Sequence, residues 1–87
     1  MSVDVLSTNV HNSLMETRKE ILSSFGKRLQ NLRTDLNLSQ EKLAEIAGFD
    51  RTYISLLERG IRNPSLVNVF RLAKALNVSP DKLLKFD

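Results

Sequence analysis

Two short helical patterns joined by a turn that contains glycine constrain the fold of this chain more than any other feature. The first pattern runs over residues 40–47 and the second over residues 51–59. Ser39 and Asp50 stand just before them, and both residue types favour the N-cap position because a side-chain oxygen accepts a hydrogen bond from a free backbone N–H. Gly48 suits the left-handed conformation that ends a helix. Helices this short are unstable alone, so both must pack against the rest of the chain.

An earlier helix is predicted by an apolar stripe. Its members follow the i, i+4, i+7, i+11 spacing of one buried helix face, and they are Phe25, Leu29, Leu32 and Leu36. The helix begins either near Ser24 or further back, where Ile21 extends the stripe, and Asn37 suits its end. We therefore expect an N-terminal extension over residues 1–20, helical or disordered, and a folded domain over residues 21–87.

Two more helices are expected after the pair. Ser65 caps a helix over residues 66–76, and Asn77 suits a left-handed stop after it. Ser79 and Pro80 open a short fifth helix, because proline is tolerated in a first turn. The expected inner face of the fourth helix comprises Leu66, Val69, Phe70, Leu72, Ala73 and Leu76. No stretch alternates apolar and polar residues long enough for a convincing strand, so the predicted fold class is all-α with five helices.

Composition narrows the classes of function. The chain has 87 residues, no cysteine and one histidine, which gives one domain and excludes disulfides, thiolate metal sites and cysteine nucleophiles. With no glycine-rich phosphate loop and no metal-ligand spacing, we expect no enzyme, no cofactor and no metal. No apolar run approaches the roughly 18 residues of a membrane span, and the N-terminus lacks a signal-peptide pattern, so we expect a cytoplasmic protein.

Charge is distributed unevenly along the chain. Residues 1–48 carry six basic and six acidic side chains, and residues 49–87 carry seven and four, so the net charge of +3 lies entirely in the second part. A basic half suggests a polyanionic partner, although a solvated surface would look the same. On a helical wheel, Ile54, Leu57 and Glu58 share one side of the second short helix. The opposite side carries Arg51, Thr52, Ser55, Leu56 and Arg59. This outer face suits a helix laid into the major groove of DNA.

Two short helices joined in this way form a helix-turn-helix unit, and three stretches together resemble the Cro/repressor-type (Xre) helix-turn-helix family. They are LSQEKLAEIAG, YISLLERGIRNPS and LAKALNVSPDKLL, while DRTYISLLERGIRNPSL is similar to the controller proteins of restriction–modification systems. The resemblance implies a sequence-specific transcriptional regulator that binds a pseudo-palindromic double-stranded DNA operator as a homodimer. Two alternatives are a phage-type repressor and an antitoxin or adaptor that uses the same fold mainly for protein interaction.

The resemblance also implies roles for individual residues. Base reading would fall to Arg51, Thr52, Ser55 and Leu56, of which Leu56 could contact a thymine methyl group or merely pack on a neighbour. Contacts to the DNA backbone would fall to Ser39, Gln40, Tyr53, Arg59, Arg62 and Asn63. An internal ion pair between Arg33 and Glu58 is implied as well. For the remaining basic residues we expect solvated faces: Lys27, Arg28, Arg71 and Lys74.

Three apolar residues fall outside the predicted core. Val67, Leu84 and Phe86 are either scattered exposures on a monomer or part of a dimer patch built from the last two helices. A dimer would read more base pairs than a monomer, since two reading helices across a twofold axis would reach two half-sites about 34 Å apart. RNA polymerase is a further partner to consider, with Glu41 or Glu45 as contacts in the case of an activator.

Overall fold

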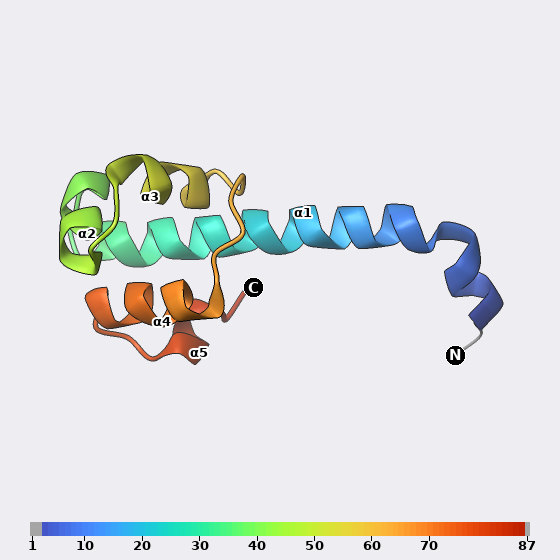
Figure 1. Cartoon of the computed structure of the whole chain (residues 1–87). Coiled ribbons are helices and arrows are strands. Elements are labelled where there is room, and N and C mark those ends of the chain that lie inside the picture. The colour runs from blue at the N-terminus through green and yellow to red at the C-terminus, as the bar shows by residue number, and fades with distance from the viewer. Residues whose placement is uncertain (1–2, 87) are drawn as a thin grey trace.

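The computed structural model describes the backbone of residues 3–86 and the side chains of residues 17–86, and α-helix is the only regular secondary structure in that range. The five helices are α1 (Val3–Asp35), α2 (Gln40–Ala47), α3 (Arg51–Glu58), α4 (Leu66–Ala75) and α5 (Pro80–Leu83). The later helices gather around the C-terminal half of α1, with α3 on one side of it and α4 and α5 on the other (Figure 1). The predicted all-α, five-helix fold is confirmed. α1 begins at Val3, earlier than either start predicted for the first helix, so residues 3–20, expected as an N-terminal extension, are part of the same helix.

Side-chain caps fix where the short helices begin. Ser39 Oγ accepts a hydrogen bond from the backbone N–H of Lys42 at 2.9 Å, and Asp50 Oδ1 accepts from the N–H of Thr52 at 3.4 Å. Ser65 Oγ does the same for α4 at 3.1 Å. These three predicted caps are confirmed, because each satisfies a donor that the helix itself leaves free. Ser79 differs from the prediction, since its side chain makes no such bond at the start of α5.

Left-handed residues follow four of the helices. Gly48 has a φ of 78° after α2 and Gly60 one of 73° after α3, while Asn37 and Asn77 have φ values of 57° and 56° after α1 and α4. The stops predicted at Asn37, Gly48 and Asn77 are confirmed, and glycine and asparagine are the residues that adopt this conformation most readily. The predicted ends of α3 and α4 are each one residue too long, because Arg59 and Leu76 are C-caps and not helical residues.

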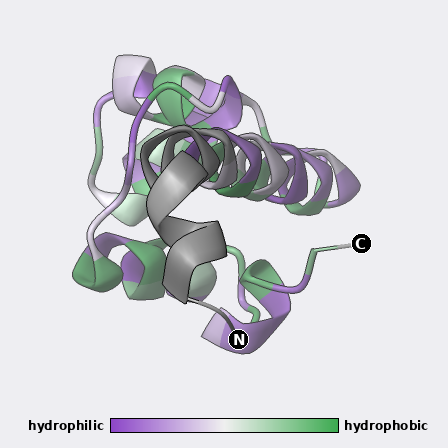
Figure 2. Ribbon diagram, turned by 90° about the vertical axis from the view of Figure 1, so that its right-hand side faces the viewer, coloured by the Kyte–Doolittle hydropathy of each residue, from purple (hydrophilic) through white to green (hydrophobic). Residues whose placement is uncertain are grey.

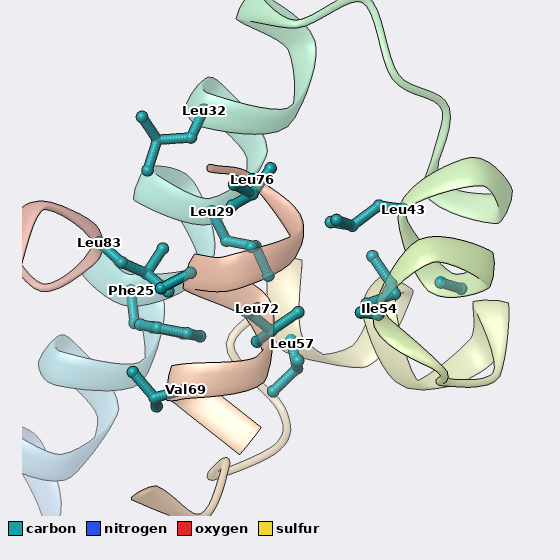
Figure 3. Packing of buried hydrophobic residues seen from close by; sticks show 13 residues of the cluster. Phe25, Leu29, Leu32, Leu43, Ile54, Leu57, Val69, Leu72, Leu76 and Leu83 are labelled. Carbon is teal, nitrogen blue, oxygen red and sulfur yellow. The ribbon is translucent and has the colours of Figure 1, made fainter. Parts of the chain in front are cut away.

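The core lies where the C-terminal half of α1 meets the four short helices. Each short helix has a hydrophobic side and a hydrophilic side (Figure 2). The hydrophobic sides converge on leucines from every helix (Figure 3). The fully buried large side chains are Leu29, Leu43, Ile54, Leu57, Leu72, Leu76 and Leu83. Each is worth about 1.5–3 kcal/mol relative to an exposed position, so this cluster provides the main stabilisation of α2 and α3.

Four residues predicted for buried helix faces are exposed instead. Leu36 is 49% exposed because α1 ends at Asp35 and the chain has already turned away from the helix phase. Leu66 and Phe70 are 70% and 54% exposed. The inner face of α4 is narrower than predicted and comprises Val69, Leu72, Ala73 and the cap residue Leu76. Leu66 and Phe70 lie at the edges of that stripe, where Leu66 lines a groove with Phe25 of α1 and Phe70 lines another groove with Val67. Ile21, which was expected to extend the stripe of α1, is also half exposed.

One close approach decides how α3 sits on α1. A Cβ atom added to Gly26 would lie 2.5 Å from the carbonyl oxygen of Glu58 and 2.6 Å from that of Leu57. Both atoms belong to the backbone of α3, so they cannot move aside without moving the helix. Glycine at this position therefore allows α3 to lie directly on α1.

Candidate DNA interface

The candidate interface is centred on α3, which is anchored by its inner side. Ile54 and Leu57 are fully buried, and the Glu58 side chain is only 3% exposed. Asp50 caps the first turn, and Gly60 takes a φ of 73° just after the last. The division into an inner and an outer side follows the helical wheel drawn from the sequence. The buried inner side and the residues at both ends thus hold α3 in place.

The outer side of α3 is accessible. Arg51, Thr52 and Arg59 are exposed, and so are Arg62 and Asn63 in the following loop. Tyr53, Ser55 and Leu56 are half-buried. Leu56 therefore both packs on the protein and leaves part of its side chain free. The residues predicted for base reading lie on one flank of α3, where Arg51 and Thr52 are exposed and Ser55 and Leu56 are partly covered.

An ion pair behind α3 joins three helices. Arg33 Nε donates to Glu58 Oε2 at 2.6 Å and Arg33 Nη2 donates to Glu58 Oε1 at 2.9 Å. Arg33 Nη1 donates to the carbonyl oxygen of Leu38 at 2.7 Å, and Gln40 Nε2 donates to Glu58 Oε1 at 3.0 Å. The hydrogen bond with Glu58 raises the pKa of Arg33 above its ordinary value, against the opposing effect of burial. The structure thus brings Arg33 and Glu58 together as the resemblance implied, and adds Gln40 to the pair.

A family model described as helix-turn-helix (HTH_3) matches residues 29–83, which is more than half of the chain and includes the whole of α2, the turn and α3. The chain belongs to the helix-turn-helix family. Among its relatives, Control protein C.BamHI of Bacillus amyloliquefaciens is 49% identical over 63 residues, which cover 71% of this chain and 78% of that protein. Control protein C.SmaI of Serratia marcescens is 52% identical over 66 residues, with 76% and 75% covered.

Solved structures agree with this helix-turn-helix assignment. The crystal structure of the restriction-modification controller protein C.AhdI from Aeromonas hydrophila has a TM-score of 0.70 and 53% identity, and the match covers 71% of this chain and 94% of that one. The regulator SinR, solved in complex with DNA, has a TM-score of 0.67 and 34% identity, with 70% and 98% covered. This chain is a helix-turn-helix transcriptional regulator similar to restriction–modification controller proteins, and regulators of this type bind DNA.

The turn of the helix-turn-helix is held by a side chain that the sequence did not single out. Arg71, expected on a solvated face, donates from Nη2 to the carbonyl oxygens of Ala47 and Gly48, both at 3.0 Å. Its guanidinium carbon lies 4.1 Å from the centre of the Phe49 ring. Arg71 is exposed, as expected, although its guanidinium also makes these contacts with the turn. The expectation is wrong for Arg28, which is half-buried and donates from Nε to the carbonyl oxygen of Lys82 at 2.9 Å. No pattern in the sequence places residue 71 near the turn, so this contact is seen only in the folded structure.

The residues predicted for a dimer patch are exposed, but they do not form one cluster. Val67 is 67% exposed and lines a groove with Phe70, whereas Leu84 and Phe86 line a second groove with Leu66. The sequence prediction missed Leu66 and Phe70, which it had placed in the core. The outside of α4 is therefore more apolar than expected.

The described residues form neither a membrane-spanning helix nor a metal site. Among residues 3–86, no helix combines the length and apolarity that a bilayer crossing requires. Within the described part of the chain, no group of histidine, cysteine, aspartate and glutamate side chains has the arrangement of a metal site.

Proposed function

We propose that this helix-turn-helix regulator is a controller protein of a restriction–modification system and that it acts as a homodimer on a pseudo-palindromic operator. The observation that supports this most is the outer flank of α3, which is accessible, carries Arg51 and Arg59, and is followed by Arg62. Of the two acids next to this flank in the sequence, Glu58 is paired with Arg33 and Asp50 caps the first turn of α3. The flank therefore presents a net positive surface to a polyanion.

Base reading is assigned to the first half of α3. The exposed guanidinium of Arg51 has the fork geometry that matches the O6 and N7 acceptors of guanine, a contact worth about 1–3 kcal/mol of discrimination. Thr52 and Ser55 carry hydroxyl groups that can bond to base edges beside it. The free part of Leu56 offers an apolar contact for a thymine methyl group.

Phosphate contacts are assigned to the residues around that flank. Gln40 uses its Nε2 on Glu58, but an amide nitrogen carries two hydrogens, so the second is free for a phosphate oxygen. The Tyr53 hydroxyl accepts a hydrogen bond from Asn68 Nδ2 at 3.0 Å, which leaves its own proton available. The other members of the set are Ser39, Arg59, Arg62 and Asn63, all exposed.

A homodimer is proposed because one α3 covers too few base pairs for specific control. The candidates for the contact between the two subunits are the exposed apolar residues on α4 and after α5: Leu66, Val67, Phe70, Leu84 and Phe86. Glu41 and Glu45 are exposed on α2 and are the candidate contacts for RNA polymerase if the regulator activates transcription.

The test begins with selection of a duplex from a randomised pool by the wild-type protein. The affinity for that duplex is then compared with the affinity for a scrambled duplex of equal length, over a range of salt concentrations. A dimer with about 8 phosphate contacts gives a log–log salt slope near about −7.

Arg51→Ala is expected to lose most of the discrimination between the two duplexes, whereas Arg18→Ala, which removes the same charge from an exposed position on α1, is expected to keep it. Equal discrimination in the Arg51 variant and the wild type would overturn the assigned reading mode. A wild type that enriches no duplex would overturn the proposed function.

A further inference from the structure

We propose that Arg71 and Asn68 of α4 are positioning residues that set the orientation of α3 and thereby the sequence discrimination of the protein, without touching DNA themselves. The inference deepens the proposed function and rests on it, because it requires α3 to be the reading helix. It concerns one connected set of contacts that runs from α4 to both sides of the helix-turn-helix turn. We call this set the α4 clamp, and its members are Ala47, Gly48, Phe49, Tyr53, Asn68 and Arg71.

The first half of the α4 clamp holds the end of α2. The last carbonyl groups of a helix have no partner within the helix, and Arg71 Nη2 donates to two of them, those of Ala47 and Gly48. A cation at this end also interacts favourably with the helix dipole. Gly48 takes the left-handed φ of 78° directly beneath this guanidinium. The conformation of the turn is therefore fixed from outside the turn, by a residue of α4.

The second half of the α4 clamp reaches the first turn of α3. The guanidinium of Arg71 lies over the Phe49 ring, whose centre is 4.9 Å from that of the Tyr53 ring at an interplanar angle of 49°. Asn68 Nδ2 donates to the Tyr53 hydroxyl at 3.0 Å, so α4 holds Tyr53 directly as well. Tyr53 follows Arg51 and Thr52 in the same helical turn. A shift of Tyr53 therefore moves the side chains assigned to base reading.

Orientation matters here because α3 is short. Its eight residues are anchored by Ile54 and Leu57 near the middle and the C-terminal end, whereas Arg51 and Thr52 are exposed at the N-terminal end. A bidentate contact needs its donor group held to within about 0.5 Å and 10–20°. The α4 clamp is the contact from outside the helix-turn-helix that acts on this end of α3. Its loss is expected to reduce discrimination more than overall DNA affinity.

The competing explanation is that Arg71, which is partly exposed, contacts a phosphate group directly. The two explanations differ in a measurable way. Loss of a phosphate contact weakens binding to all duplexes equally and lowers the magnitude of the salt slope by about 1 per subunit. Loss of a positioning contact lowers the ratio of affinities for the selected and scrambled duplexes and leaves the slope unchanged.

The experiment measures that ratio and that slope for wild type, Arg71→Met, Arg71→Lys and the control Lys74→Met, at a temperature where circular dichroism shows each protein folded. Methionine keeps much of the apolar stem, and lysine keeps the charge but loses the planar fork. Lys74 is an exposed cation on the same helix, so its variant loses the same charge. We expect both Arg71 variants to lower the ratio of affinities for the selected and scrambled duplexes at least about fivefold, the lower end of what one base contact contributes. The salt slope of both variants should stay unchanged, and Lys74→Met should keep the wild-type ratio.

Asn68→Ala gives an independent readout, because it removes only the contact with Tyr53 and leaves Arg71 in place. It is expected to lower the ratio in the same direction even if the Arg71 variants fail to fold. An unchanged ratio in the folded variants, or a reduced slope with equal weakening on both duplexes, overturns the inference while the proposed function stands. If the wild type itself does not discriminate between duplexes, the proposed function fails and the inference fails with it.

Discussion

Glu58→Gln is the substitution that most directly tests how α3 is held in place. Glutamine keeps the size of the side chain but removes the charge that faces Arg33 at the junction of α1, α2 and α3. It also puts an amide N–H group where one of two acceptor oxygens now stands. Three donors point at those oxygens, two from Arg33 and one from Gln40. At least one of them would then face another donor.

The expected loss follows from burial. The Arg33 and Glu58 side chains are only 10% and 3% exposed, so water cannot replace the missing partner. Arg33 cannot escape by losing its proton, because arginine stays charged at any working pH. Removing one partner of a buried pair typically costs about 3–5 kcal/mol. A small domain is stable by about 5–15 kcal/mol, so we expect the variant to lose a large part of its free energy of unfolding.

Urea denaturation followed by far-ultraviolet circular dichroism measures this loss. Glu45→Gln is the matched control, because Glu45 belongs to an exposed i, i+3 pair with Lys42 at 3.6 Å, for which about 0–1 kcal/mol is expected. The reasoning would be refuted if the Glu58 variant lost less than about 1 kcal/mol, the range of an exposed pair. A change in the slope of the free energy of unfolding against urea concentration, and not only in the midpoint, would indicate instead that the variant alters the compactness of the unfolded or the native state.

Three further substitutions test local features. Gly26→Ala forces a Cβ atom against the backbone of α3 and is expected to cost about 1–3 kcal/mol in the same urea experiment, so an unchanged midpoint would disprove the close approach. Ser39→Ala removes the N-cap of α2 and is expected to cost about 1 kcal/mol, whereas Ser39→Asp should retain most of the stability. The hydrogen bond from Ser79 lowers the pKa of Asp81, so Ser79→Ala should raise that pKa toward its ordinary value in a carboxyl NMR titration. The Asp81 carboxylate stabilises the folded state above its unfolded pKa, and this contribution is lost as the pH falls through the lower folded pKa. An unchanged pKa of Asp81 in the Ser79 variant would show that the hydrogen bond from Ser79 does not cause the lowered pKa.

Features that depend on a few neighbouring residues could be predicted from the sequence. Ser39, Asp50 and Ser65 cap helices because their oxygens reach a backbone N–H only two or three residues away. Asn37 and Asn77 end helices through their own backbone preference. The outer flank of α3 was predictable for a related reason, because the helical period alone separates it from the buried Ile54 and Leu57.

Features that depend on contacts between segments far apart in the sequence could not be predicted in this way. A helical wheel gives the direction of Leu66 and Phe70 but not the width of the stripe of α4 that its neighbours bury, so both were wrongly placed in the core. The contact of Arg71 with the turn joins residues 23 and 24 positions apart. The role of Gly26 could not be predicted from its neighbours in the sequence either, because its missing side chain matters only where the backbone of α3 approaches it.

The central claim, that DNA lies against the exposed flank of α3, can be tested directly because the chain contains no cysteine. A single thiol introduced as Thr52→Cys reports on that flank, and one introduced as Asp81→Cys reports on α5, where the native residue is also exposed. The measurement is the rate of maleimide labelling with and without a saturating amount of the selected duplex. We predict that the duplex protects Cys at position 52 in proportion to the fraction bound and leaves position 81 unchanged. Equal labelling of position 52 with and without bound duplex would contradict the account.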